Sequence, residues 1–188
     1  MEQTVSLMLA TAALFGFLVT AVTGYFLIPA LHKLHFGQTI REEGPTWHSK
    51  KNGTPTMGGL CFIFGILVAV GAAWLGFAHK EAGVFSASHL HAILLVLFLA
   101  LGSGLIGFLD DFIKVVKHRN LGLTPVQKII MQVVVTGVFM LGLRALGLMS
   151  TTVMFPVAGA VNLGILYYPI AFFGIIFLVN AVNLTDGL

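Results

Sequence analysis

The sequence predicts an all-α, polytopic membrane protein with about five transmembrane helices and its amino terminus on the outer, periplasmic side. Of the 188 residues, 57% are hydrophobic and only 9% are charged, whereas a soluble domain carries about 25% charged residues. Five segments are apolar over the roughly 20 residues that a helix needs to cross a bilayer. Basic residues are also distributed unequally between the two sides that five crossings define.

The five predicted helices span residues 5–31, 60–78, 90–109, 126–148 and 163–182. The first is long enough to tilt in the membrane. The fourth is the least apolar, because Lys128 and Arg144 flank its uncharged core and must extend toward the membrane surface. A Thr-Pro-Val-Gln string at 124–127 has capping-box spacing with proline at the first helical position, which predicts the start of this helix. At 188 residues, the chain is predicted to form a single small membrane domain, residues 1–188, and no internal repeat is evident.

Lysine and arginine predict the orientation of these helices. Cytoplasmic loops are enriched in both residues, and the predicted opposite side holds only Lys80 and Arg144. The amino terminus is therefore predicted outside, and the fifth helix would end on the cytoplasmic side. The loops at 32–59 and 110–125, with the adjoining helix ends, hold Lys33, Arg41, Lys50, Lys51, Lys114, Lys117, Arg119 and Lys128.

The loop at residues 44–59, Gly-Pro-Thr-Trp-His-Ser-Lys-Lys-Asn-Gly-Thr-Pro-Thr-Met-Gly-Gly, has a composition suited to an anionic ligand. Glycines let a backbone approach a ligand closely, and lysines and threonine hydroxyls bind phosphate and sugar groups. Lys51 and Thr56 are the predicted ligands, assisted by backbone amides of residues 54–59. A basic loop attracted to anionic lipid headgroups is the alternative. It accounts for the two lysines but not for the Thr-Pro-Thr-Met-Gly-Gly string.

Asp110 and Asp111 follow the third apolar segment directly and are the predicted catalytic pair, with Lys114 beside them. If the helix continues, Lys114 lies at i+4 and i+3 from the two carboxylates and can reach both. Adjacent carboxylates repel unless a cation is near, and Mg²⁺ prefers such oxygen ligands. The two aspartates are therefore the predicted metal ligands. The alternative is a solvated helix end with an ordinary ion pair.

The fifth segment ends in a polar string, Asn180-Ala-Val-Asn-Leu-Thr-Asp-Gly-Leu188, whose Asn183 and Asp186 are predicted to bind substrate. Positions 180 and 183 share a helix face, and position 186 extends that row. Alternatively, Asn180 and Asn183 form hydrogen bonds between helices, a common use of asparagine in membranes. Lys128, one turn into the fourth helix, either reaches the same site or extends to the membrane surface.

Taken together, these motifs resemble the phospho-N-acetylmuramoyl-pentapeptide-transferases, a branch of the membrane polyprenyl-phosphate hexosamine-1-phosphate transferases. The resemblance rests on the Gly-Pro…Thr-Pro-Thr-Met-Gly-Gly loop, on Asp-Asp-x-x-Lys at 110–114 and on Asn-Leu-Thr-Asp-Gly-Leu at 183–188. It implies an Mg²⁺-dependent enzyme of the bacterial inner membrane. That enzyme transfers phospho-N-acetylmuramoyl-pentapeptide from its UDP derivative to undecaprenyl phosphate on the cytoplasmic face, giving lipid I and UMP.

The resemblance also implies a role for each candidate residue. Asp110 and Asp111 would lie at the catalytic centre, where one of them would either deprotonate the lipid phosphate or form a covalent phospho-enzyme. Lys114 and Lys128 would neutralise phosphate charge, and the nucleotide-sugar pocket would contain Lys51, Thr56, Asn183 and Asp186. The partners would be the two substrates and the lipid bilayer, with no nucleic acid, and a homodimer is compatible with this picture. The resemblance covers the amino-terminal half of a ten-helix enzyme whose other half would supply a further metal-binding aspartate, so we expect residues 1–188 alone to have little or no activity.

Two other functions are compatible with parts of the pattern. A sibling transferase that uses UDP-N-acetylglucosamine would share the aspartate pair, but the Thr-Pro-Thr-Met-Gly-Gly string is typical of the muramoyl branch. Half of an ion-coupled transporter would also contain paired acids in apolar helices, near the membrane midplane. Here the acids follow the apolar segments, at the edge where a soluble nucleotide and a lipid headgroup would meet.

Overall fold

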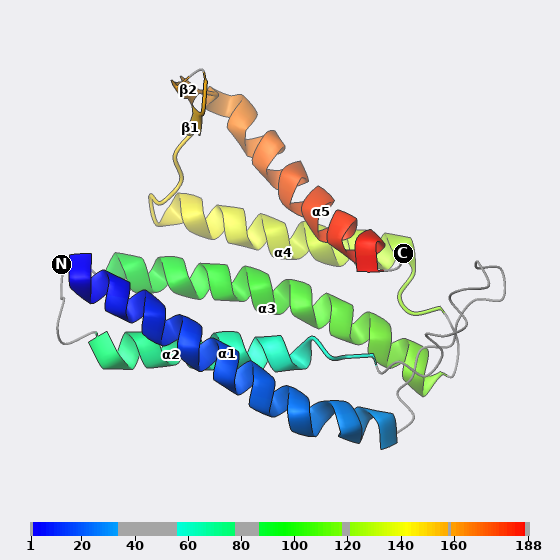
Figure 1. Ribbon diagram of the computed structural model, residues 1–188. Coiled ribbons are helices and arrows are strands. Elements are labelled where there is room, and N and C mark those ends of the chain that lie inside the picture. The colour runs from blue at the N-terminus through cyan, green and yellow to red at the C-terminus, as the bar shows by residue number, and fades with distance from the viewer. Residues whose placement is uncertain (1, 34–55, 78–86, 118–120, 158, 187–188) are drawn as a thin grey trace. The chain divides into compact units, whose positions relative to one another are not determined.

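The computed structural model describes residues 2–33, 56–77, 87–117, 121–157 and 159–186. Five of its helices are long and apolar enough to cross a membrane, as the composition predicts (Figure 1). The protein is therefore an all-α, polytopic membrane protein. Its chain divides into two compact units, one of residues 1–87 and 107–124 and the other of residues 88–106 and 125–188.

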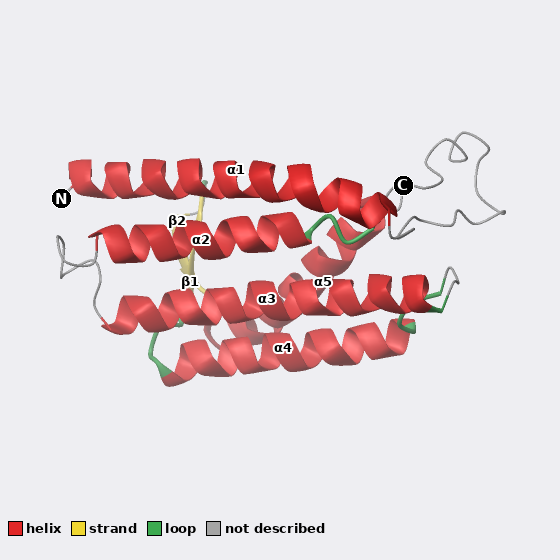
Figure 2. Ribbon diagram, turned by 90° about the horizontal axis from the view of Figure 1, so that it is seen from below, coloured by secondary structure: helices red, strands yellow, loops and turns green. Residues whose placement is uncertain are grey.

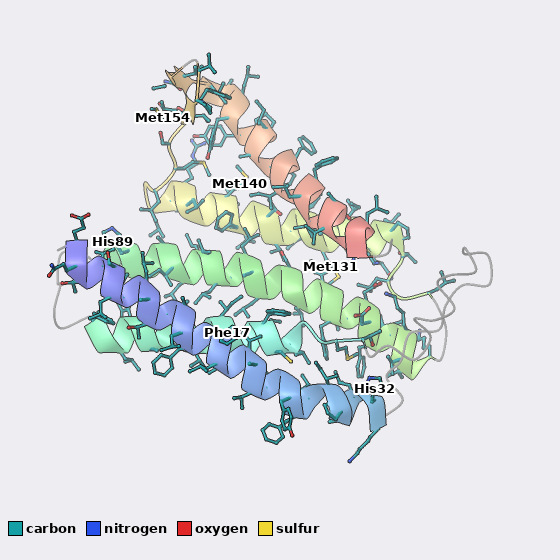
Figure 3. All side chains as sticks on the ribbon, viewed as in Figure 1. Phe17, His32, His89, Met131, Met140 and Met154 are labelled. Carbon is teal, nitrogen blue, oxygen red and sulfur yellow. The ribbon has the colours of Figure 1, made fainter. Side chains whose placement is uncertain are left out.

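The first unit is built on α1 (Glu2–Lys33) and α2 (Leu60–Phe77), which lie side by side in Figures 1 and 2. Small residues four positions apart on α1, Gly16, Thr20 and Gly24, face α2. A Cβ placed on Gly65 of α2 would lie 2.9 Å from the Gly16 carbonyl oxygen, and Gly24 approaches the sulfur of Cys61. Small residues let membrane helices pack closely without a hydrophobic driving force. Elsewhere on α1, large side chains such as Phe17 (Figure 3) remain exposed, as lipid contact requires.

Helix α3 (Ala87–Val116) contributes its first part to the second unit and its end to the first. The prediction ended this helix at residue 109, where the apolar run stops. The observed helix continues through two further turns, because charged side chains at i, i+3 and i+4 stabilise a helix that leaves the apolar region. This extension places Asp110, Asp111 and Lys114 on a regular helix.

In the second unit, α4 (Pro125–Ala145) packs along the first part of α3 (Figure 2). A Cβ added to Gly102 of α3 would lie 2.8 Å from the side chain of Val135 on α4. A Cβ added to Gly142 of α4 would lie 2.6 Å from the side chain of Leu95 on α3, so the two helices are in contact at these glycines. The predicted start at Pro125 is confirmed. The predicted end at residue 148 is wrong, because Gly147 adopts a φ of 66° and closes the helix earlier.

The closure of α4 has the geometry of a Schellman motif. The amide of Gly147 donates to the carbonyl of Arg144 at 3.1 Å, and the amide of Leu148 donates to that of Leu143 at 2.9 Å. A glycine in the left-handed conformation makes this pair of bonds with little strain. The helix therefore ends at Ala145, and the chain turns away after it.

An antiparallel hairpin that the sequence analysis did not predict connects α4 to the last helix. Strands β1 (Thr152–Phe155) and β2 (Gly159–Asn162) pair with Thr152 opposite Asn162 and Phe155 opposite Gly159. A short 3-10 helix, η2 (Gly164–Leu166), leads into α5 (Tyr167–Asp186). The regular helix starts four residues later than predicted because Gly164, with a φ of 54°, turns the chain first.

Candidate functional site

The candidate site begins with three charged side chains on the last turns of α3. The Lys114 ammonium lies 2.7 Å from Asp110 Oδ2 and donates to Asp111 Oδ1 at 3.0 Å. The spacing at i+4 and i+3 predicted this double contact, and the structure confirms it. Two carboxylates and one ammonium leave one excess negative charge at the end of an apolar helix.

Asp110 is held more tightly than its neighbour. Its side chain is only 5% exposed, and its Oδ1 accepts a hydrogen bond from the backbone amide of Leu123 at 2.8 Å. Both carboxylate oxygens therefore have donors within the first unit. Hydrogen bonds to a charged group are stronger than neutral ones, so Asp110 ties the segment before α4 to the end of α3.

Gly122 makes this contact possible. A Cβ at position 122 would lie 2.5 Å from the backbone oxygen of Asp110 and 2.8 Å from its Cγ, far inside van der Waals contact. Any side chain there would displace the Asp110 carboxylate or move the Leu123 amide away from it. The site thus depends on a glycine that packs against an acid 12 positions earlier.

Asp111 is the more accessible acid of the pair. Its side chain is 31% exposed, and its Oδ1 accepts a hydrogen bond from Lys114. Oδ2 of Asp111 has no hydrogen-bond donor within the described parts of the chain. This oxygen can accept a proton or a cation, whereas the buried Asp110 serves to orient its surroundings.

The donor set of these two acids fits Mg²⁺. This ion is bound through one or two carboxylates, retains several waters and takes its other ligands from substrate phosphates. Asp111 Oδ2 provides one such oxygen, while Lys114 and Leu123 occupy the oxygens of Asp110. No group of three His, Cys, Asp or Glu side chains that could form an all-protein metal cage occurs in the residues whose structure is described.

The turn before α2 contains Thr56, which is buried with 7% of its surface exposed. Met57 follows with a φ of 67°, a conformation that costs energy for residues other than glycine. The amide of Leu60 donates to the carbonyl of Met57 at 3.1 Å, which closes the turn onto the helix. The Thr-Pro-Thr-Met-Gly-Gly string thus ends in a constrained turn. Lys51 lies outside the described residues.

The remaining predicted residues belong to the second unit. Lys128 is half-buried one turn into α4, and Asn183 is exposed near the end of α5. Asp186 is the last residue of α5, and its side chain is outside the described part of the structure. The meeting of these residues with Asp110 and Asp111 around one substrate stays a prediction.

Asn180 forms a hydrogen bond between helices, which was one of the two alternatives that the sequence left open. Its Nδ2 donates to Gln132 Oε1 of α4 at 2.7 Å and to the carbonyl of Ile176 at 2.8 Å. The Gln132 amide returns a longer bond of 3.4 Å to Asn180 Oδ1. In Figure 1, the last part of α5 approaches α4, and this amide pair joins the two helices there.

Sequence reasoning missed Gly122, Leu123 and Gln132. Gln132 carried a usable signal, because a polar residue in the middle of an apolar helix needs a partner. Gly122 carried a weaker one, as a glycine just before a helix start. Leu123 carried none, since it acts through a backbone amide that every residue except proline has.

Comparison with known proteins agrees with the motifs. Residues 92–188 match the model of glycosyl transferase family 4, and residues 51–63 match signature 1 of phospho-N-acetylmuramoyl-pentapeptide-transferase. Proteins of that name are similar over most of this chain: 47% identical over 92% of it in Halalkalibacterium halodurans, 44% over 94% in Desulfitobacterium hafniense, and 41% over 94% in Clostridium perfringens.

The matches cover 50% of the Halalkalibacterium and Desulfitobacterium proteins and 51% of the Clostridium protein. The chain thus spans about half the length of these curated relatives. The family model begins at residue 92 and includes the aspartate pair, while the signature includes Lys51, Thr56 and the turn that leads into α2. On this basis the chain belongs to glycosyl transferase family 4 and carries a signature of its phospho-N-acetylmuramoyl-pentapeptide-transferases.

Proposed function

We propose that this chain takes part in the transfer of phospho-N-acetylmuramoyl-pentapeptide from its UDP derivative to undecaprenyl phosphate, the step that forms lipid I and UMP. The observation that carries the proposal is the acid cluster at the end of α3. Lys114 bridges both aspartates, and Asp111 keeps one oxygen without a donor among the residues that the structure describes. The signature at residues 51–63 and the names of the relatives support the choice of substrates.

The reaction is a displacement at phosphorus. An ionised oxygen of the lipid phosphate bonds to the β-phosphorus of the nucleotide, and the bond from that phosphorus to the bridging oxygen breaks. UMP leaves with the bridging oxygen. The protein must offset the negative charge of the diphosphate and hold attacking and leaving oxygens in line, because phosphoryl transfer depends mainly on positioning and electrostatics.

Asp111 and Lys114 are suited to different parts of this task. The open Oδ2 of Asp111 can take the proton of the lipid phosphate, since its side chain is one-third exposed. The Lys114 ammonium lies between the acids and can attract the phosphate groups. Asp110 keeps Lys114 and the Leu123 segment in place.

Bound Mg²⁺ would supply further charge neutralisation on the diphosphate, with Asp111 as its accessible protein ligand, because Lys114 and the Leu123 amide already occupy the oxygens of Asp110. Lys51, Thr56, Lys128, Asn183 and Asp186 would bind the nucleotide sugar. Lysines and hydroxyls suit phosphates and sugars, and amide and carboxylate groups suit the base and ribose. We place the site on the cytoplasmic face of a bacterial inner membrane, where the excess of basic residues predicts it.

The test is UMP release from UDP-N-acetylmuramoyl-pentapeptide and undecaprenyl phosphate with Mg²⁺. The enzyme is the polypeptide from the full reading frame that contains these residues, in membranes. We expect turnover with this nucleotide and little with UDP-N-acetylglucosamine. Turnover with UDP-N-acetylglucosamine but not with the muramoyl nucleotide would instead favour the sibling transferase. The absence of UMP release with both nucleotides would contradict the proposal.

Residues 1–188 produced alone provide a further comparison. They span about half the length of the relatives, so we expect little or no UMP release from them under the same conditions. Robust turnover would show that these 188 residues contain the whole catalytic machinery.

A further inference from the structure

A cavity of about 810 Å³ lies in the second unit where α4 ends and α5 begins. None of the residues predicted for the transfer reaction lines it. Its lining combines an arginine and a tyrosine with apolar side chains. The lining residues are Arg144, Thr151, Gly164, Ile165, Leu166, Tyr168 and Pro169.

Arg144 and Tyr168 provide hydrogen-bond donors to this cavity. The guanidinium of Arg144 lies over the Tyr168 ring, 5.4 Å from its centroid, a distance typical of a cation–π contact. Arg144 has no carboxylate partner, and the Tyr168 hydroxyl has no hydrogen bond, within the described ranges of the chain. The contact with the ring holds the guanidinium beside Tyr168 and leaves its N–H groups for another ligand. Their fork geometry matches the oxygens of a phosphate.

Two further lining residues, Ile165 and Leu166, are apolar and exposed. Ile165 is 82% exposed and Leu166 61% exposed. On the adjoining hairpin, Met154 projects outward (Figure 3) and is 74% exposed. In a chain that crosses a membrane, such side chains at a helix end contact acyl chains, and tyrosines such as Tyr167 and Tyr168 are typical of the membrane interface.

The connection between hairpin and helix is held in shape. Asn162 Oδ1 accepts hydrogen bonds from the Thr151 hydroxyl at 2.7 Å and from the Gly164 amide at 2.9 Å. These bonds tie the chain before β1 to the turn after β2, so both edges of the cavity have a defined geometry.

We propose that this cavity binds an anionic phospholipid of the phosphatidylglycerol class at the membrane interface. Arg144 and Tyr168 donate to the headgroup phosphate, and Ile165 and Leu166 contact the acyl chains. The apolar walls favour a lipid over free phosphate. A zwitterionic headgroup binds more weakly, because its ammonium is repelled by a guanidinium that no acid of the described residues neutralises. The proposal is independent of the transfer reaction.

The test measures lipid retention by native mass spectrometry. The polypeptide from the full reading frame is mixed in detergent with equal amounts of dioleoyl-phosphatidylglycerol and dioleoyl-phosphatidylcholine. We expect the wild-type protein to prefer the first lipid. Arg144→Gln should reduce this preference about fivefold, the contribution of one basic group at an anionic surface. Arg144→Lys should retain part of the preference, because the charge remains while the fork of donors is lost.

Lys33→Gln is the matched control, since it removes one exposed basic residue from the last turn of α1. It should leave the preference unchanged, and an equal loss in this variant would overturn the proposal. An undiminished preference in Arg144→Gln would also overturn the proposal. Displacement of the lipid by millimolar inorganic phosphate would overturn it as well, because it would indicate a site for a free anion. If Arg144→Gln does not fold, Tyr168→Phe tests the proposal instead. It keeps the ring under the guanidinium and should lower retention about threefold through the lost hydrogen bond, whereas unchanged retention would contradict the proposal.

Discussion

Each unit contains a polar cluster on helices that are apolar enough to cross a membrane. One cluster is the amide pair of Gln132 and Asn180, and the other consists of Asp110, Asp111 and Lys114. The two amides form a closed pair, with hydrogen bonds of 2.7 and 3.4 Å in opposite directions. The charged cluster is also bonded internally, but Asp111 keeps an oxygen without a donor in the described parts of the chain, and its side chain is 31% exposed. The first arrangement joins helices, and the second leaves a group available for chemistry.

The difference shows which buried polar residues to treat as structural and which as functional. An unpaired polar group in a membrane is costly, so most such groups satisfy one another. The aspartate cluster differs, because one acid has donors on both oxygens while its neighbour keeps an oxygen without a donor among the described residues. Ionisable residues in apolar helices are for this reason candidates for function, and the distinction can be tested by substitutions that break one cluster at a time.

The largest effect is expected from Asp111→Asn. This change preserves the shape of the side chain but removes the negative charge of its open oxygen. We expect UMP release by the full-length polypeptide to fall about 10²- to 10⁴-fold, the usual contribution of a general base. The thermal unfolding temperature in detergent should change little, because the side chain is partly exposed.

Glu2→Gln is the matched control for Asp111→Asn, since it makes the same carboxylate-to-amide change at the exposed start of α1. It should leave both turnover and unfolding temperature unchanged. Near-normal turnover in Asp111→Asn would show that the open oxygen has no role in the reaction. The contrast with the closed amide pair would then lose its functional meaning.

Gly122→Ala should have the next largest effect. The added methyl group would overlap with Asp110, so either the carboxylate or the Leu123 amide must move. Overpacking of this kind costs about 1–3 kcal/mol of stability. Turnover should also fall, by about tenfold or more, because small displacements of positioned groups are costly in catalysis.

Gly107→Ala on α3 is the control, because a Cβ there would meet no atom of the described residues within 4 Å beyond its own helix backbone. Replacing a helical glycine by alanine in open space stabilises the helix by up to about 1 kcal/mol. The two alanine variants should therefore shift the unfolding temperature in opposite directions. Equal shifts would indicate that the close packing of Gly122 on Asp110 contributes nothing.

The sequence predicted the parts of this molecule that depend on local composition and spacing. Five apolar runs indicated five helices, Thr124 and Pro125 indicated where α4 starts, and the i+3 and i+4 spacing indicated that Lys114 would contact both aspartates. Each of these follows from residues close together along the chain. The observed helices begin and end within a few residues of the predicted limits except at the end of α3.

The rest depends on geometry that spacing does not encode. From the sequence alone, either Gly142 or Gly147 could be the glycine that ends α4. The backbone conformation shows that Gly147 ends the helix, whereas Gly142 packs against Leu95. Likewise, the amide of Leu123 reaches Asp110 across 13 positions and leaves no mark in the side-chain sequence. The hairpin was missed because its strands are only four residues each.

The smallest effect is expected from breaking the amide pair. Asn180→Leu leaves the buried Gln132 amide without a partner among the described residues, whereas Gln132→Leu leaves Asn180 its bond to the Ile176 carbonyl at 2.8 Å. Each change should lower the free energy of unfolding by about 0.6–2 kcal/mol, and Asn180→Leu should cost more. Turnover should change far less than in Asp111→Asn.

The double variant Gln132→Leu, Asn180→Leu distinguishes a closed pair from two independent polar groups. If the amides serve mainly each other, replacing both by apolar side chains removes the unsatisfied partner, and the combined loss should be smaller than the sum of the single losses. Additive losses would mean that each amide has a separate partner. A large loss of turnover in the double variant would place Asn180 with the reacting groups, and the division between a structural and a chemical cluster would fail.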